Sequence, residues 1–288
     1  SMIAADMGLT AKVSVRINPD VDARTHAKIS TGKSENKFGI SYKRAREVYR
    51  RIAQLPNIEA VGVDMHIGSQ ITDLEPFGNA FGLMAELVTE LRADGHRIEH
   101  IDVGGGLGIP YDHDQEAPPH PEAYAAVVRD KVGQLGCALV IEPGRLLVGN
   151  AGILVTRVEY VKTGDKDFVI VDAAMNDLLR PTLYEAHHDI QPVNPSNLPP
   201  ITGDIVGPVC ETGDYLAKDR TIAGVEEGDL LAVMSAGAYG AVMASTYNSR
   251  PLIPEVLVDG PRWHVIRPRK SLDELIALDS VPDWISST

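Results

Sequence analysis

The chain has little cysteine, a deficit of basic residues and no long apolar run. Its 288 residues contain two cysteines, Cys137 and Cys210, far apart in the sequence. This spacing argues against a disulfide framework and favours a reducing, cytoplasmic compartment. No apolar run reaches the ~18 residues that a membrane-spanning helix needs. The start shows no targeting pattern, so we expect no membrane partner.

The charge balance is strongly acidic. Lys and Arg number 27 against 40 Asp and Glu, which gives a net charge of −13. This balance argues against nucleic acid or an anionic membrane as the main partner. An anionic ligand would therefore need a locally basic pocket.

The first half of the chain alternates between predicted strands and helices. The hydrophobic patterns predict strands at residues 12–19, 58–67, 98–103 and 138–141, and helices at residues 41–55, 77–94 and 121–135. Ser41 is the expected cap of the first helix. Alternating strands and helices indicate a parallel sheet covered by helices, either doubly wound or a (β/α)8 barrel. Four such units make half a barrel, so a barrel would place its other half upstream of Ser1.

The pattern changes after Gly149. Residues 150–268 contain β-rich segments separated by turn-forming residues, and a short helix is expected at Leu272–Leu278. We therefore predict an α/β domain over residues 1–149 and a mostly β domain with a helical tail over residues 150–288.

One predicted strand runs directly into three glycines, Gly104–Gly106. Glycine lets the backbone approach an anion closely, and the N–H groups of such a turn can bind phosphate. Most glycine-rich turns after strands only reverse the chain, however. On its own, this segment leaves both interpretations open.

Six short motifs follow one another in a characteristic order. They are HIGSQ (66–70), DVGGGLG (102–108), EPGR (142–145), RPTLY (180–184), CETGD (210–214) and GAYG (237–240). As a set they resemble the diaminopimelate decarboxylases, pyridoxal-phosphate (PLP) enzymes with an alanine-racemase-like barrel and a C-terminal β domain. The resemblance implies a PLP-dependent conversion of meso-2,6-diaminopimelate to L-lysine and CO2, the last step of lysine synthesis. Decarboxylases of the same fold that act on ornithine, arginine or carboxynorspermidine are the nearest alternatives.

The resemblance implies cofactor-binding roles for residues of the first domain and for one tyrosine of the second. His66 would stack on the cofactor ring, and Glu142 would face the pyridine nitrogen. A carboxylate there keeps the nitrogen protonated, so that the ring can act as an electron sink. The remaining residues implied to contact the cofactor are Ser69, Gly104, Gly105, Gly106, Gly144, Arg145 and Tyr239.

The implied substrate has two amino-acid heads, and further matched residues would bind them. Arg145 and Arg180 would bind carboxylates, for which the planar guanidinium is well suited. Tyr184 and Tyr239 would contribute hydroxyl groups, and Glu211 would receive the distal ammonium. Taken singly, each arginine would more often form a surface ion pair, and a tyrosine such as Tyr239 would ordinarily be a buried core residue.

Cys210 is the implied proton donor to the carbon that loses CO2. In the family, this cysteine and Glu211 reach the active site of the neighbouring subunit, which implies a homodimer with two shared sites. No metal is implied, and Cys137 is interpreted as a core residue. A lone cysteine among apolar residues is more commonly inert.

The sequence departs from the family pattern at one point. The Schiff-base lysine of the family lies in a first-strand motif resembling YAVKAN, and none of the ten lysines here lies in such a context. Together with the strand count and with Ser1 preceding Met2, this suggests that the first half of the barrel is missing. The alternative is a non-catalytic fragment or a PLP-binding homologue without a Schiff base. The Gly-, Ser- and Lys-rich segment His26–Phe38 is a hypothetical lid.

Overall fold

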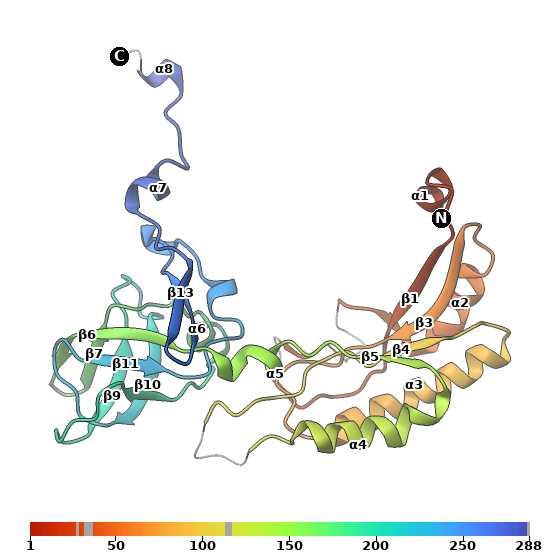
Figure 1. The fold of residues 1–288 in the computed structure, drawn as a ribbon, viewed down its shortest axis with the longest axis horizontal. Coiled ribbons are helices and arrows are strands. Elements are labelled where there is room, and N and C mark those ends of the chain that lie inside the picture. The colour runs from red at the N-terminus through yellow and green to blue at the C-terminus, as the bar shows by residue number, and fades with distance from the viewer. Residues whose placement is uncertain (27–28, 32–36, 113–116, 287–288) are drawn as a thin grey trace. The chain divides into compact units, whose positions relative to one another are not determined.

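The computed structural model describes residues 1–26, 29–31, 37–112 and 117–286. The chain divides into two compact units, Ser1–Gly149 (unit 1) and Asn150–Thr288 (unit 2) (Figure 1). The hypothetical lid includes residues 27–28 and 32–36, which lie outside the described residues.

Unit 1 is built on a parallel sheet of five strands in the order β2-β1-β3-β4-β5. The strands are β1 (Ala11–Asn18), β2 (Ile40–Ser41), β3 (Ile58–Asp64), β4 (His100–Asp102) and β5 (Ala138–Val140). The four strands predicted from the sequence and their parallel arrangement are confirmed. The two-residue strand β2 was not predicted. All strand C-termini lie at one edge of the sheet, where ligands bind in folds of this kind.

The helices of unit 1 are α1 (Met2–Asp6), α2 (Ala45–Ile52), α3 (Glu75–Ala93), α4 (Pro121–Val132) and α5 (Arg145–Val148). Helix α3 buries the predicted apolar face, with Phe77, Phe81 and Leu91 all fully inaccessible. The ring of Phe77 meets Tyr124 of α4 edge-on at 5.0 Å between centroids, so aromatic contact fixes α3 against α4 (Figure 1).

The prediction of one helix from Ser41 to Leu55 is wrong at both ends. Residues Tyr42–Arg44 form a 3-10 turn before α2, and Leu55 lies beyond the helix. Ser41 makes no side-chain cap hydrogen bond. It pairs with Asn18 in the sheet instead, because the strand ladder continues to this residue.

A glycine in β3 makes room for a contact between its neighbours. Gly62 is in register with Ser14 on β1 and with His100 on β4. Ser14 Oγ reaches His100 Nε2 at 2.6 Å. A Cβ on Gly62 would lie 2.1 Å from that nitrogen. The hydrogen bond therefore depends on the missing side chain.

Unit 2 contains a six-stranded sheet in the order β10-β9-β7-β6-β11-β8, in which only the β7–β9 pair is parallel. Its strands are β6 (Leu154–Lys162), β7 (Asp167–Val171), β8 (Ile190–Pro192), β9 (Ile201–Val206), β10 (Tyr215–Ile222) and β11 (Leu230–Val233). The hairpin β12 (Glu255–Asp259) and β13 (Arg262–Arg267) follows, and the helices are α6 (Arg180–Tyr184), α7 (Leu272–Ile276) and α8 (Asp283–Ser286). The predicted change to mostly β structure is confirmed, and α7 lies within the segment Leu272–Leu278 where a short helix was expected.

Short 3-10 turns complete both units, at η2 (Tyr42–Arg44), η3 (Gly133–Leu135), η4 (Gly149–Ala151), η5 (Ala241–Met243) and η6 (Tyr247–Ser249). Within the described residues, no helix has both the length and the hydropathy needed to cross a bilayer.

Candidate active site

Three loops meet at the C-terminal edge of the sheet in unit 1. They follow β3, β4 and β5 and carry the HIGSQ, GGGLG and EPGR motifs. Backbone hydrogen bonds join them: Ile71 N–H donates to Gly106 O at 2.9 Å, and Glu142 N–H donates to Gly104 O at 2.9 Å. The structure therefore brings together the matched residues of unit 1.

The three glycines are required by the close approach of these loops. A Cβ on Gly104 would lie 2.3 Å from Met65 O, one on Gly105 2.1 Å from Glu142 O, and one on Gly106 2.1 Å from Gly68 O. Gly104 and Gly106 also have φ values of +70° and +104°, which favour glycine. Their missing side chains thus give space to neighbouring backbone.

Two of the three N–H groups of the glycine loop Gly104–Gly106 donate hydrogen bonds within the protein. Gly104 N–H donates to Asp102 Oδ1 at 2.8 Å and Gly105 N–H to His66 Nδ1 at 3.2 Å. Among hydrogen bonds between described residues, none uses the Gly106 N–H. The first N–H groups of α5, which follows Gly144, have no acceptor within the helix.

A cleft of about 480 Å³ lies beside these donors. It is lined by the glycine loop, by residues 143–147 and by apolar side chains of α4 and β5. Backbone N–H groups at a glycine turn and at a helix start form a donor set suited to phosphate. The residues present therefore fit the phosphate group of PLP.

His66 is held as a neutral imidazole. Because its Nδ1 accepts from Gly105 N–H, the ring proton lies on Nε2. Burial lowers the pKa of His66, and Arg16 lowers it further. Arg16 also donates to the His66 carbonyl oxygen at 3.3 Å. A half-buried neutral ring at this position suits stacking on an aromatic cofactor.

Arg145 is the first residue of α5, and its side chain is buried, with 7% exposed. Its Nη2 donates to Ser69 Oγ at 2.9 Å, and its Nη1 donates to the Tyr111 hydroxyl. Ser69 thus supports Arg145 directly. Tyr111 was missed in the sequence analysis, and because it lies between the motifs, no pattern there identifies it.

A row of charged side chains crosses the same edge of the sheet. Arg16, Asp64 and Asp102 are in register on β1, β3 and β4, so they project to one face. Burial raises the pKa of Asp64 to about 6, and repulsion from Asp102 and Glu142 adds to this effect. Glu142 itself is exposed at the end of β5. The sequence analysis missed Asp64, which ends β3 in the structure as Asp102 ends β4.

In unit 2, Arg180 and Tyr184 are the first and last residues of α6. Residues four apart share one face of a helix. Arg180 is 5% exposed, and its Nη1 lies 2.6 Å from His188 Nε2. His188 is a second residue that the sequence analysis missed.

The CETGD segment is fixed by its last residue. Asp214 is 3% exposed, and its carboxylate accepts from Met175 N–H and Val209 N–H, both at 2.7 Å. Cys210 and Glu211 are exposed. These contacts hold the segment and leave the two side chains accessible.

Tyr247 is a further residue of unit 2 that the sequence analysis missed. Its hydroxyl donates to Glu211 Oε2 at 2.7 Å, and this bond raises the pKa of Tyr247. Tyr239 of the GAYG motif is 40% exposed. Its φ of +57° is uncommon for a bulky residue.

Comparison with known proteins places the chain in a family. The family described as "Pyridoxal-dependent decarboxylase, pyridoxal binding domain" matches residues 2–149. Diaminopimelate decarboxylase of Neisseria meningitidis serogroup A is 56% identical over 276 residues, which cover 96% of this chain and 67% of the relative. The chain belongs to the diaminopimelate decarboxylases. Members of this family are PLP-dependent carboxy-lyases.

Two further matches agree with this assignment. Diaminopimelate decarboxylase of Pseudomonas aeruginosa is 54% identical, over 97% of this chain and 67% of the relative. The crystal structure of the Helicobacter pylori enzyme complexed with L-lysine has a TM-score of 0.91 and 43% identity, and it covers 96% of this chain and 69% of that one. The chain thus spans about two thirds of the length of the relatives that it matches.

Proposed function

We propose that this chain holds the PLP phosphate and part of the substrate site of a diaminopimelate decarboxylase, which converts meso-2,6-diaminopimelate to L-lysine and CO2. The observation that supports this most directly is the cleft in unit 1. Gly106, the start of α5 and the buried Arg145 line this cleft, and the neutral ring of His66 accepts from Gly105 N–H of the same glycine loop.

The residues of unit 1 would hold the cofactor. The loop Gly104–Gly106 would surround the phosphate, to which the Gly106 N–H and the N–H groups of the Gly144 turn would donate. Ser69 and Arg145 would lie behind them, and the face of His66 would lie on the ring. The Glu142 carboxylate would hold a proton on the pyridine nitrogen. PLP bound in this way supplies an electron sink for the electron pair left when CO2 departs.

The residues of unit 2 would bind the substrate and deliver a proton. Arg180 would bind a carboxylate of the substrate, and the Tyr184 and Tyr239 hydroxyls would hydrogen-bond to the substrate. The Glu211 carboxylate would bind the distal ammonium. The Cys210 thiol would transfer its proton to the carbon that has lost CO2.

The active unit is proposed to be a homodimer. The exposure of Cys210 and Glu211 is consistent with a contribution to a neighbouring subunit's site. Sedimentation of the full-length protein at micromolar concentration should give twice the chain mass, and a monomer with full activity would contradict this. The exposed Cys210 and half-buried Cys137, both free thiols, favour the cytoplasm.

The function is tested by CO2 release from the full-length protein supplied with PLP. We expect release from meso-diaminopimelate at least about 100-fold faster than from ornithine or arginine, because a site built to bind a second polar head rejects substrates that lack it. Preference for ornithine would overturn the proposed substrate.

A further inference from the structure

His188 occupies a completely buried position beside a proposed substrate-binding residue. It lies between α6 and β8 and has 0% of its surface exposed. Its Nε2 is 2.6 Å from Arg180 Nη1, and its Nδ1 is 2.8 Å from the carbonyl oxygen of Met234. Both ring nitrogens are therefore in hydrogen bonds.

The two partners fix the position of the proton on this ring. A guanidinium group can only donate, so Nε2 must accept from Arg180. A carbonyl oxygen can only accept, so Nδ1 must carry the hydrogen. The arrangement therefore requires a neutral imidazole in the Nδ1–H form. A second ring proton would remove the acceptor and place a positive charge against Arg180.

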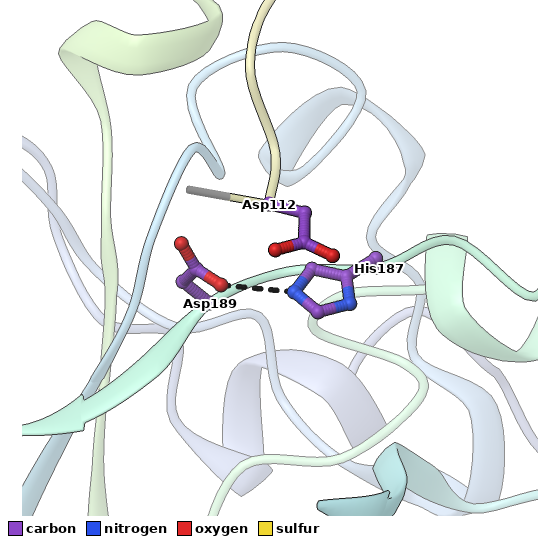
Figure 2. Close-up of side chains that lie close together, drawn as sticks. All are labelled: Asp112, His187 and Asp189. Carbon is purple, nitrogen blue, oxygen red and sulfur yellow. Dashed lines mark hydrogen bonds and ion pairs between the residues drawn. The ribbon is translucent and has the colours of Figure 1, made fainter. Parts of the chain in front are cut away.

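The backbone around His188 is held independently of Arg180. Arg220 of β10 donates to the His188 carbonyl oxygen at 2.9 Å and to His187 Nδ1 at 2.8 Å. His187 Nε2 lies 2.9 Å from Asp189 Oδ1, and the dashed line in Figure 2 marks this hydrogen bond. These contacts keep the segment in place, so the imidazole of His188 presents its acceptor from a fixed position.

We propose that His188 is a positioning residue that orients the Arg180 guanidinium for binding the substrate carboxylate. The proposal rests on the proposed function, in which Arg180 contacts the substrate. A free arginine side chain samples many rotamers, and ordering them on binding weakens affinity. A buried acceptor that orders Arg180 beforehand removes that loss. His188 itself need not touch the substrate.

Two substitutions at this position separate the acceptor from the packing. In His188→Gln the side-chain oxygen can reach the place of Nε2 and keep an acceptor for Arg180. In His188→Asn the shorter amide can still donate to Met234 O but cannot reach Arg180. His187→Asn is the matched control, because it changes the neighbouring histidine and leaves the Arg180–His188 bond intact.

The variants are compared in the full-length protein by kcat and KM for diaminopimelate, by L-lysine titration and by thermal melting. We expect H188N to raise KM and the lysine Kd by about tenfold or more, as loss of a hydrogen bond to a charged group does. The kcat should change less than about threefold, because the lost interaction acts on binding in both ground and transition states. H188Q should recover most of the affinity, and H187N should stay within about twofold of the wild type.

Three outcomes would overturn the proposal. The first is an equal loss of affinity for diaminopimelate and lysine in H187N and H188N. The second is a fall in kcat at unchanged KM in H188N. The third is a folded H188N with unchanged affinity for both ligands. Nitrogen-15 NMR of the His188 ring gives a readout independent of substrate, since a proton on Nε2 at pH 7.5 would also contradict the assignment. If the wild type released no CO2 from diaminopimelate, the proposed function would fail together with any substrate role of His188. Normal wild-type turnover with an unaffected H188N would count against His188 alone.

Discussion

The two units fix their candidate site residues by different means. In unit 1, three loops cross so closely that backbone oxygens occupy the places where the side chains of Gly104–Gly106 would lie. In unit 2, buried polar side chains hold the segments, with Asp214 bonded to two backbone N–H groups and His188 bonded to Arg180. The first arrangement is sensitive to added volume, and the second to a lost acceptor.

The largest loss of folding stability is expected from Gly105→Ala in unit 1. The new Cβ would lie 2.1 Å from Glu142 O, so two loops must separate, at a cost of about 4 kcal/mol. Gly144→Ala is the control, because its Cβ meets nothing within 4 Å and its φ is −99°. Urea unfolding of the chain measures both. Equal stabilities for the two variants would contradict the steric explanation.

Among the substitutions proposed for unit 2, Asp214→Ala should lower the free energy of unfolding the most. It leaves the N–H groups of Met175 and Val209 without their acceptor in a buried site, which costs about 3 kcal/mol. Asp214→Asn keeps one oxygen and should lose about half as much. Urea unfolding of both variants gives the comparison. If Asn were as damaging as Ala, the number of acceptors would not explain the loss.

Asp64→Asn tests the electrostatics of unit 1 and should be stabilising. The pKa of Asp64 is raised from 3.8 to about 6, so the folded state binds more protons than the unfolded state between these values. Stability therefore falls as pH rises through this window, and the cost is complete above pH 6. Because the group is only half-buried, we expect a gain of about 1–2 kcal/mol at pH 7.5 and none at pH 3.

Melting temperatures of the wild type and Asp64→Asn from pH 3 to pH 8 measure this difference. Asp6→Asn, an exposed site on α1, is the control and should follow the wild type. A constant difference between Asp64→Asn and wild type over the whole range would show that the carboxylate charge is not the cause.

Tyr247→Phe should have the smallest effect on stability. Its hydroxyl bond to Glu211 lies at the surface, so the free energy of unfolding should change by less than about 0.5 kcal/mol. The lysine Kd of the full-length protein should rise about two- to threefold, since the Glu211 carboxylate loses a contact that orders it. A marked fall in melting temperature would instead give Tyr247 a structural role.

The alternation of strands and helices could be predicted because hydrophobic periodicity reports burial directly. The buried face of α3 follows from the spacing of Phe77, Phe81 and Leu91. The helix start at Ser41 could not be predicted correctly, because Ser41 pairs in the sheet with Asn18 of β1, a residue far away in the sequence. At Ser41, pairing with a distant strand outweighs the local preference of serine for capping a helix.

The candidate site was predicted where motifs are contiguous and missed where the contacts are made across the fold. Gly104–Gly106 and Arg145 stand in matched motifs, whereas Tyr111 and His188 gain their importance from the arginine that each contacts. The sequence also suggested that the glycines make room for an anion. In the structure, neighbouring backbone accounts for the missing side chains. Because the N–H groups of Gly104 and Gly105 donate within the protein, the Gly106 N–H is the one that the loop offers to a ligand.

The contact across Gly62 has a consequence for how this sequence can evolve. Any side chain at residue 62 would run into His100 Nε2, which a Cβ would approach to 2.1 Å. A larger residue at 62 is therefore accessible only after His100 has become smaller, whereas His100 can be replaced first while Gly62 stays. The two positions should covary in a fixed mutational order, with His100 as the permissive first step.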